Sequence, residues 1–298
     1  MDELEGVRRK YAQRIRDVLW RCHRVRLSDD LVSAFARIPR EAFLGPAPWL
    51  VRGAPPATAS QRLTSRLAPR RYSSRDWSTR DPHQLYRDVA VAIDAARGLN
   101  NGQPSGLALW IQLLDLRRGD RVLHIGCGLG YYTALMAALV APGEVIGVEI
   151  DATLARLARA NLASVDSVFV VNGDGAHHDP GPVDAILVNA GVTHPQTLWL
   201  DRLRPGGRML LPLTNHEGIG MMLKVTSQPA GYAARFVSKL LIFHCAGARD
   251  VQYSERLASQ LAGNAWRSVQ SLRRDSHSPD AECWFHGQEF CLSARPIG

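Results

Sequence analysis

The residues best suited to chemistry in this chain lie in a glycine-rich segment directly after an apolar run. Gly126, Gly128 and Gly130 follow the run Val122–Ile125. Glycines at such a turn let a ligand approach the backbone closely, and the amides at the start of a following helix point toward that ligand. Glu149 ends the next apolar run, 19 residues after Gly130, where a carboxylate accepts hydrogen bonds from ribose hydroxyls. The pattern predicts a site for a nucleoside-containing ligand.

A dinucleotide such as NAD satisfies these features almost as well, so the loops after the next strands decide between the two ligands. Asn172–Gly175 follows a third apolar run, and Asp184–Gly191 contains the fourth. At the carboxyl ends of parallel strands, such loops border the ligand crevice. Asp174 is placed to accept a hydrogen bond from an adenine amino group. This arrangement favours S-adenosylmethionine over NAD.

Short apolar runs alternate with helical patterns through the middle of the chain and must position these residues. The first of the helical patterns carries an apolar stripe and opens at a proline. The pattern predicts helices at 104–116, 131–140, 152–162 and 195–203, and strands at 122–125, 145–150, 168–171 and 185–188. Buried strands alternating with helices indicate a doubly wound α/β fold with a mostly parallel, Rossmann-like sheet. Residues 208–212, 221–226 and 236–244 predict further strands that include an antiparallel edge.

Segments on either side of this core predict added N- and C-terminal parts. Residues 5–20 and 29–37 have the spacing of amphipathic helices, and residues 45–82 are rich in Pro, Ser and Arg, which predicts a long loop. Beyond residue 250 the pattern predicts a helix and then, near 283–292, a strand or hairpin. We therefore expect a basic, helical and loop-rich N-terminal region at 1–97, a core at 98–247 and a C-terminal extension at 248–298.

The net charge of +8 is concentrated in the N-terminal third of the chain. Residues 1–97 contain 19 Lys and Arg against 11 Asp and Glu. Such a surface attracts nucleic acid, an acidic peptide or a carboxylate-bearing substrate. Scattered arginines without interleaved aromatic residues argue against nucleic acid as the partner.

Cysteine spacing and hydropathy argue against a disulfide-rich, metal-binding, secreted or membrane protein. The five cysteines are odd in number and include no Cys-x-x-Cys pair, so neither a disulfide framework nor a metal site is expected. The chain has no uninterrupted apolar stretch of about 18 residues, and its first residues are charged where a signal peptide is apolar. We expect reduced thiols, a cytoplasmic location and no membrane partner.

Residues 85–213 resemble the protein-L-isoaspartate O-methyltransferase (PCMT) family of S-adenosylmethionine-dependent methyltransferases, and the similarity extends back to Leu31 and forward to Gly247. The resemblance is carried by Ile38-Pro39-Arg40, Tyr86-Arg87-Asp88, Gln103-Pro104, VLHIGCGLGYYTALMA, VIGVEID, NGDG, VDAILVNAG and LRPGGRMLLPL. It implies that the three glycines contact the methionine part of the cofactor, Glu149 the ribose and Asp174 the adenine. It also implies that the segment Asn100–Pro104 borders the methyl acceptor.

This resemblance defines the expected site residues. For cofactor binding they are His124, Gly126, Cys127, Gly128, Gly130, Tyr131, Glu149, Ile150, Asp174, Gly175 and Asn189. At the acceptor, Asn101, Gly102, Gln103 and Ser105 are the expected catalytic residues, and Asp88, Pro104, Tyr132 and Ala190 are the expected substrate contacts. No metal is among the expected cofactors.

The chain departs from the family pattern at two positions. The family usually has an acidic residue two positions before the first glycine, where this chain has His124; the change predicts an altered but retained cofactor contact. The family's acceptor signature has the form Ser-Gln-Pro, and here it reads Gly102-Gln103-Pro104. The second change predicts a specialised relative that modifies a dedicated peptide.

We therefore expect O-methylation of a carboxylate, on an Asp or isoaspartyl side chain of a peptide or protein. A carboxylate is already deprotonated at pH 7, so such a transfer needs positioning more than a strong base. A methyltransferase acting on RNA or a small molecule is one alternative, suggested by the sequence pI of about 9.6. A binding module that keeps S-adenosylmethionine but has little catalytic activity is another.

Overall fold

The computed structural model describes residues 3–52 and 76–297. The chain divides into two compact units, which we call unit 1 (residues 1–109) and unit 2 (residues 110–298). The borders expected after residues 97 and 247 remain predictions. In the described part of the chain, no helix combines the length and the apolar character that a membrane crossing requires.

Unit 1 opens with the two amphipathic helices that the sequence predicts. α1 runs over Glu5–His23, and α2 over Asp29–Arg37. The Ser28 hydroxyl caps α2 by accepting a hydrogen bond from the Leu31 amide, which satisfies one of the unpaired donors of the first turn. Tyr11 of α1 packs edge-on against Phe35 of α2, with ring centroids 5.8 Å apart. The helices are held together by burying these apolar faces.

The remaining elements of unit 1 are short. They are the 3₁₀ turns η1 (Arg40–Phe43) and η2 (Pro82–Leu85), the strands β1 (Trp49–Val51), β2 (Trp77–Thr79), β3 (Ala92–Asp94) and β4 (Leu99–Asn100), and the helix α4, Pro104–Leu113, which extends past residue 109. β1 pairs with β2, and β3 with β4, both antiparallel. The loop expected at 45–82 is therefore wrong at β1 and β2, because strands of three residues are too short to show a period; residues 53–75 lie outside the described residues.

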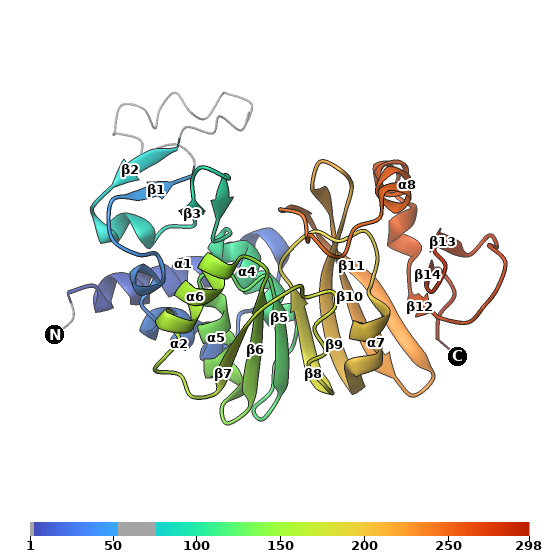
Figure 1. Ribbon diagram of the computed structural model, residues 1–298, viewed down its shortest axis with the longest axis horizontal. Coiled ribbons are helices and arrows are strands. Elements are labelled where there is room, and N and C mark those ends of the chain that lie inside the picture. The colour runs from blue at the N-terminus through green and yellow to red at the C-terminus, as the bar shows by residue number, and fades with distance from the viewer. Residues whose placement is uncertain (1–2, 53–75, 298) are drawn as a thin grey trace. The chain divides into compact units, whose positions relative to one another are not determined.

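Unit 2 contains the predicted alternation of strands and helices (Figure 1). Its strands are β5 (Arg121–Ile125), β6 (Glu144–Glu149), β7 (Val168–Asn172), β8 (Val183–Val188), β9 (Leu203–Thr214), β10 (Ile219–Gln228), β11 (Gly231–Leu241), β12 (Ser271–Arg273), β13 (Cys283–His286) and β14 (Cys291–Ser293). Its helices are α5 (Tyr131–Val140), α6 (Ala152–Asn161), α7 (Thr197–Arg202), α8 (Val251–Ala262) and the 3₁₀ turn η3 (Ala265–Ser268).

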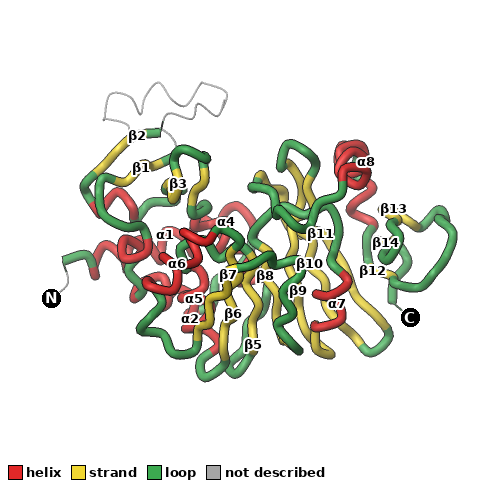
Figure 2. Tube along the Cα trace, in the orientation of Figure 1, coloured by secondary structure: helices red, strands yellow, loops and turns green. Residues whose placement is uncertain are grey.

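All ten strands of unit 2 join one sheet in the order β13-β14-β12-β11-β10-β9-β8-β5-β6-β7. The strands from β7 to β9 are parallel, and β10 begins an antiparallel part that continues through β11, β12 and β14 to β13. Figure 2 shows β7 to β11 side by side. The mixed α/β fold is confirmed, and its antiparallel part extends beyond the expected edge because the C-terminal strands add to it.

The strand order changes direction between β5 and β8, and this point positions the site. β5 lies between β6 and β8, so the chain leaves its carboxyl end toward one side and later returns on the other. Ligands of doubly wound sheets bind in the crevice at such a switch point. Successive residues of β5, β6 and β8 are buried, as expected for parallel strands covered on both faces.

A buried ion pair connects the residue directly before β5 to β9. The guanidinium of Arg208 lies 2.6 Å from the Asp120 carboxylate, and both side chains are about nine-tenths buried. Arg208 also donates to the carbonyls of Leu114, Asp115 and Asp184, which join three segments of unit 2. Breaking a buried pair by removing one partner leaves the other charge without compensation.

We expect Asp120→Asn to lower the free energy of unfolding by about 3–5 kcal/mol, the usual effect of leaving one buried charge unpaired. Urea denaturation measures the change. Asp179→Asn, which removes an exposed partner of Arg202, is the matched control and should leave the urea midpoint near that of the parent chain. Equal effects of the two substitutions would contradict a special role for the Asp120 pair.

Candidate active site

The glycine loop begins directly at the end of β5 and leads into α5. Gly126, Gly128 and Gly130 all have positive φ. At Gly130, with φ of 93°, an added Cβ would lie 2.5 Å from Cδ1 of Leu162, so both conformation and space require glycine. The first residue of α5, Tyr131, is buried. The loop therefore presents its backbone, and not side chains, at the helix N-terminus.

Glu149 connects the glycine loop to the next helix. Its Oε2 accepts a hydrogen bond from the Gly128 amide at 2.9 Å, and its Oε1 accepts one from the Asp151 amide at 3.1 Å. The residue is only 8% exposed. Each carboxylate oxygen has capacity for a further hydrogen bond. The carboxylate is thus fixed by the backbone and remains able to accept from ribose hydroxyls.

An apolar surface lies next to this carboxylate in sequence. Ile150 is 52% exposed, although it directly follows a buried strand. The Asn172 side chain donates to the carbonyls of Glu149 and Ile150 at 3.0 and 3.1 Å, which fixes the backbone here. An exposed isoleucine beside a carboxylate that can accept from ribose hydroxyls fits the flat face of an adenine. The residues present therefore suit an adenosine-containing ligand.

The loop after β7 places Asp174 at the same edge of the sheet. Asp174 Oδ1 accepts from the Ala176 amide at 2.9 Å, and Oδ2 lies 2.9 Å from Nδ1 of His177. The carbonyl of Gly175 accepts a hydrogen bond from the buried indole of Trp199. Asp174 keeps a partly exposed carboxylate in a rigid turn, as the prediction of an adenine contact requires.

Gly247 is a residue that sequence reasoning missed. An added Cβ at this position would lie 1.8 Å from Oδ2 of Asp174, so the backbone of the segment after β11 runs directly against that carboxylate. The same segment is held by hydrogen bonds between Gly191 and the backbone of Phe243 and Cys245. No local pattern could have revealed this contact, because it joins residues far apart in the sequence.

Asn189 secures the other side of the glycine loop. The backbone amide of Asn189 donates to the Ile125 carbonyl at 2.8 Å, and its side-chain amide donates to the Gly126 carbonyl at 3.3 Å. Ala190 follows it and is half-buried. Asn189 therefore supports the loop from β8, while a contact of Ala190 with the acceptor stays a prediction.

His124 lies on β5, two residues before Gly126. It is fully buried, and its Nδ1 lies 2.9 Å from Oγ1 of Thr133 on α5. Nε2 has no hydrogen-bond partner among the described residues. Burial lowers the pKa of His124 to about 3, so the ring is neutral at physiological pH. His124 thus supports the loop through α5 without adding charge.

Cys127 is a small residue that packs inside the glycine loop. The side chain is 6% exposed, and its amide donates to the Val148 carbonyl at 3.2 Å. Burial, and then the Glu149 charge, raise the pKa of the thiol well above its ordinary value. A neutral buried thiol is a poor nucleophile. In the structure, Cys127 is therefore a packing residue of the glycine loop.

The expected acceptor residues in unit 1 gather around Asp88. Its carboxylate accepts from the Ser105 amide at 2.8 Å, from the Ser105 hydroxyl at 2.7 Å and from the Gln103 side chain at 2.9 Å. Through the Ser105 amide, Asp88 satisfies one of the free backbone donors at the start of α4, where Pro104 is the first residue. These contacts assign the Ser105 hydroxyl to holding the loop.

Asn101 is held in the same unit by a buried arginine. Arg40 has no exposed surface, and its guanidinium donates to the carbonyls of Leu85 and Val89 and to Oδ1 of Asn101. Asn101 Oδ1 also accepts from the Val91 amide at 2.9 Å. Arg40 is thus a second important residue whose role the sequence did not reveal, since a buried hub of carbonyl contacts has no local pattern.

Gly102 has a conformation that favours glycine. Its φ is 77°, and an added Cβ would lie 2.7 Å from Cδ2 of Leu107. The Gly102 amide donates to Oδ1 of Asn100 at 2.9 Å, closing a tight turn. A serine here would require the loop to change. Tyr132, the other expected acceptor contact, lies in unit 2, is buried and packs edge-on against Tyr131.

The switch-point loop, the carboxylate at the end of β6 and the mixed sheet define a class I S-adenosylmethionine-dependent methyltransferase. Two solved protein-L-isoaspartate O-methyltransferase structures share the fold. One gives a TM-score of 0.61 at 24% identity, covering 80% of this chain and 65% of the other. The second, from Plasmodium falciparum and solved with S-adenosyl-L-homocysteine, gives 0.58 at 16% identity, covering 80% and 97%.

Sequence comparison identifies the family. The family model for protein-L-isoaspartate(D-aspartate) O-methyltransferase matches residues 71–242. The enzyme named protein-L-isoaspartate O-methyltransferase from Ignicoccus hospitalis is 35% identical over 164 residues, 53% of this chain and 75% of the relative. Protein-L-isoaspartate O-methyltransferase 1 of Archaeoglobus fulgidus is 30% identical over 216 residues, 71% and 81% of the two chains. The chain belongs to the protein-L-isoaspartate(D-aspartate) O-methyltransferase family, and its cofactor is S-adenosylmethionine.

Replacing Glu149 by Gln should weaken S-adenosylmethionine binding at least tenfold. The change removes the charge that we expect to receive the ribose hydroxyls, and a hydrogen bond to a charged group contributes about 1.5–3 kcal/mol. Isothermal titration calorimetry measures the affinity. Glu144→Gln is the matched control, because Glu144 begins the same strand at the opposite end. Unchanged affinity in the Glu149 variant would refute the assigned ribose contact.

Burial of His124 predicts a loss of stability in acid. Its pKa falls from the ordinary 6.5 to about 3 on folding, so between these values the unfolded chain binds the proton more readily. The free energy of unfolding is therefore not reduced by this histidine above pH 6.5, and it decreases as the pH falls below that value. His124→Asn should reduce the slope of unfolding free energy against pH by up to about 1.4 kcal/mol per pH unit. The exposed His216 provides the control: a slope that changes equally in His216→Asn would rule out His124 as its source.

Proposed function

We propose that this chain transfers the methyl group of S-adenosylmethionine to a carboxylate oxygen of an aspartyl or isoaspartyl side chain in a peptide or protein. Family membership supports the reaction class. The observation that carries the proposal is the Glu149 carboxylate, fixed by the Gly128 and Asp151 amides beside the exposed Ile150. When bound, S-adenosylmethionine supplies an electrophilic methyl: the new C–O bond forms as the C–S bond breaks, leaving S-adenosylhomocysteine.

The chain itself contributes orientation and exclusion of water. A carboxylate acceptor is already ionised at pH 7, so no strong general base is required. The cofactor loop agrees with this requirement, because His124 is buried and neutral and Cys127 is buried and protonated. Rate enhancement then comes from holding the acceptor in line with the methyl group and away from water.

We assign the acceptor segment Asn100–Pro104, together with the adjoining Ser105, a positioning role. Asp88 holds Gln103 and Ser105, and Arg40 holds Asn101. The side chains proposed from the sequence as catalytic are therefore engaged in shaping the loop. The acceptor would contact the loop backbone and the exposed side of Gln103.

The conformation of Gly102 supports a specialised acceptor. A serine at this position would meet Leu107 and would need an unfavourable positive φ. The glycine is thus built into the loop shape, and a loop of this shape presents no side-chain hydroxyl at residue 102. We infer that the chain modifies an aspartate in a dedicated peptide context in preference to isoaspartyl sites in general.

A basic groove on unit 1 supports an acidic substrate. It is formed by α1 and α2 and is lined by Arg9, Lys10, Gln13, Arg14, Arg16, Asp29 and Ser33, among others. Positive clefts of this kind concentrate acidic ligands, and their attraction weakens with salt. An acidic segment next to the modified aspartate is therefore the expected substrate feature.

The cysteines support a reducing compartment. All five are free, and Cys127, Cys245 and Cys291 are buried. Disulfides are rare in cytosolic proteins, where thiols are kept reduced. We propose the cytoplasm as the location of this enzyme.

Incubation with tritiated S-adenosylmethionine tests the function. An acidic aspartyl peptide should be labelled faster than a neutral peptide containing one isoaspartyl residue, and mild base should release the label as methanol. The Michaelis constant for the acidic peptide should rise with salt, because exposed charges are screened at higher ionic strength.

Three outcomes would contradict parts of this proposal. A base-stable label would indicate methylation of nitrogen, as in an RNA methyltransferase. Tight cofactor binding without transfer to any peptide or lysate fraction would indicate a binding module. Efficient turnover on the isoaspartyl peptide would remove the reason for proposing a specialised acceptor.

A further inference from the structure

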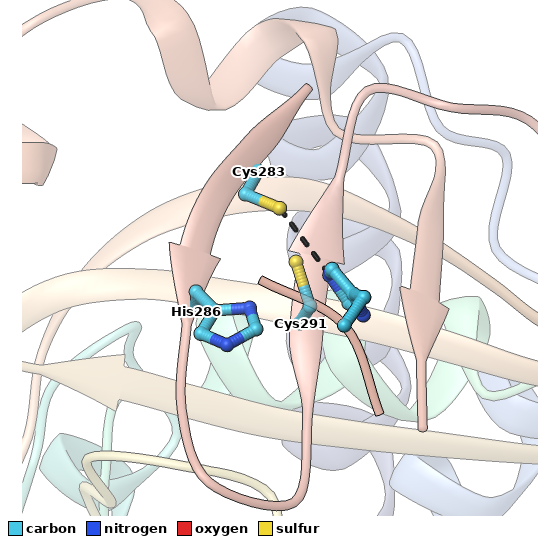
Figure 3. Close-up of side chains that lie close together, drawn as sticks. Cys283, His286 and Cys291 are labelled. Carbon is cyan, nitrogen blue, oxygen red and sulfur yellow. Dashed lines mark hydrogen bonds between the residues drawn. The ribbon is translucent and has the colours of Figure 1, made fainter. Parts of the chain in front are cut away.

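Two histidines and two cysteines converge at the C-terminal end of unit 2. His277, Cys283, His286 and Cys291 place their ligand atoms, ring nitrogens and sulfurs, within 4.8 Å of one another. Figure 3 shows Cys283 and His286 on one strand and Cys291 on its neighbour, with their side chains gathered together. The group lies on β13, β14 and the preceding loop, several strands away from β5 and β6 in the sheet order.

The hairpin register explains how three of these side chains share a face. His286 pairs directly with Cys291, so the two point to the same side of the sheet. Cys283 and His286 are three residues apart and would point to opposite faces of a regular strand. The register shifts between Cys283 and Phe285, however, and this irregularity turns Cys283 toward the other two.

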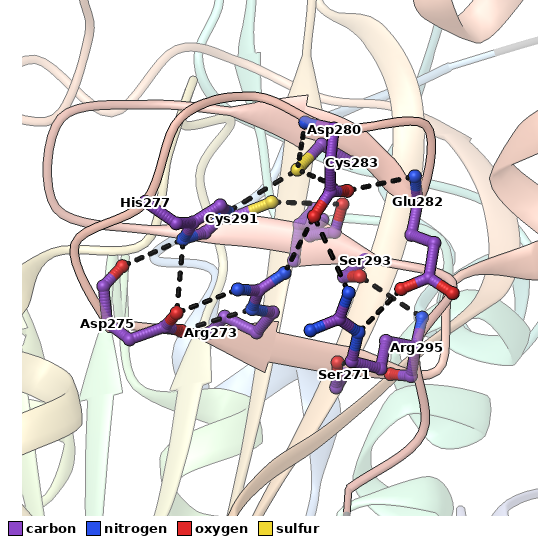
Figure 4. Close-up of polar contacts among 11 residues, drawn as sticks. Ser271, Arg273, Asp275, His277, Asp280, Glu282, Cys283, Cys291, Ser293 and Arg295 are labelled. Atoms are coloured by element: carbon purple, nitrogen blue, oxygen red, sulfur yellow. Dashed lines mark hydrogen bonds and ion pairs between the residues drawn. The ribbon is translucent and has the colours of Figure 1, made fainter.

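The fourth side chain, His277, is oriented by an acidic partner. Its Nε2 lies 3.4 Å from the Cys283 sulfur, while its Nδ1 is 2.9 Å from the Asp275 carbonyl and 3.2 Å from the Asp275 carboxylate. Arg273 in turn holds that carboxylate at 2.7 Å (Figure 4). A histidine that binds a metal through one nitrogen and a carboxylate or carbonyl through the other shows this arrangement.

His286 supplies an independent sign of a missing partner. Its Nδ1 is buried and has no hydrogen-bond partner among the described residues. Leaving a buried polar atom unsatisfied costs about 1–3 kcal/mol. A cation bound between the rings and sulfurs would satisfy this atom and would explain why two imidazoles and two thiols lie together.

We propose that His277, Cys283, His286 and Cys291 bind a structural Zn²⁺ ion. Two sulfur and two nitrogen ligands are a preferred set for tetrahedral zinc, and four protein ligands leave no open position for catalysis. Bond lengths of about 2.0–2.3 Å place neighbouring ligand atoms roughly 3.3–3.8 Å apart, and the His277–Cys283 contact of 3.4 Å lies in that range.

Binding releases one proton from each thiol to solvent, and the two thiolates neutralise the charge of the ion. The Cys283 thiol donates to Oδ1 of Asp280 at 3.2 Å, and that donation ends when the proton leaves. The Asp280 amide already donates to the same sulfur at 3.4 Å, and this hydrogen bond would be kept by the thiolate. Arg273 and Arg295 lie 3.5 and 3.6 Å from the Asp280 carboxylate and keep it compensated.

The ion would fasten the loop between β12 and β13 to the final hairpin. β12, β13 and β14 contain three, four and three residues, so few backbone hydrogen bonds hold this edge of the sheet. His277 is the ligand that comes from the loop, and the other three come from the hairpin. Zinc binding would thus stabilise the C-terminal edge independently of the methyl-transfer site.

Metal analysis of the full-length chain, purified with reductant and without chelator, tests this site. Inductively coupled plasma mass spectrometry should find about one zinc ion per chain, and His277→Gln and Cys291→Ser should each lower that content at least fivefold. Cys22→Ser is the matched control, because Cys22 is an exposed cysteine in α1, and it should retain the metal. Cobalt substitution should give the visible absorption of a tetrahedral thiolate site in the parent chain and in Cys22→Ser.

Two further measurements keep the proposal open to refutation if Cys291→Ser does not fold. A zinc chelator added to the parent chain should make the segment 274–282 more sensitive to protease, and added zinc should reverse this effect. A chain with reduced thiols that contains no zinc and gives no cobalt spectrum would overturn the proposal. So would a Cys283–Cys291 disulfide found by mass spectrometry after alkylation, since it would show that these sulfurs form a redox pair.

Discussion

The hydrogen bonds that Glu149 accepts from the Gly128 and Asp151 amides are the constraint on which the active site depends. They join the loop after β5 to the start of α6 and fix the carboxylate that we expect to receive the ribose hydroxyls. The neighbouring loops lie at the same edge of the sheet: Asn189 supports the glycine loop from β8, and Asp174 lies on the loop that follows the neighbouring strand, β7. A nucleoside site is expected here because the four parallel strands β5, β6, β7 and β8 end at one edge of the sheet.

The fold is made rigid by buried strands and by buried arginines that donate hydrogen bonds to backbone carbonyls. β5 and β8 are buried along almost their whole length, so their carboxyl ends have little freedom. Arg208 and Asp120 fasten the opposite end of the sheet. In unit 1, Arg40 performs a comparable task by donating to several carbonyls near the acceptor segment. Both units thus use a buried arginine to hold loops that lack regular secondary structure.

The sequence predicted the parallel core and the class of cofactor because both follow local patterns: apolar runs, glycine spacing and a carboxylate at a strand end; the individual cofactor contacts stay predictions. It failed for contacts between distant residues. Gly247 against Asp174 and Arg40 against Asn101 have no local pattern. The cluster of His277, Cys283, His286 and Cys291 was not predicted either. Its cysteines do not have Cys-x-x-Cys spacing, and Cys283 and His286 share a face only through a register shift. Strands as short as β1 and β2 show no period at all.

A crystal structure with S-adenosylhomocysteine tests the central claim most directly. The decisive measurement is the distance between the Glu149 carboxylate oxygens and the two ribose hydroxyls. Our account predicts that both hydroxyls donate to Glu149 at about 2.5–3.0 Å, with the Gly128 and Asp151 hydrogen bonds retained. A ribose bound away from Glu149, or a Glu149 that leaves the Gly128 amide to reach the ligand, would contradict the account.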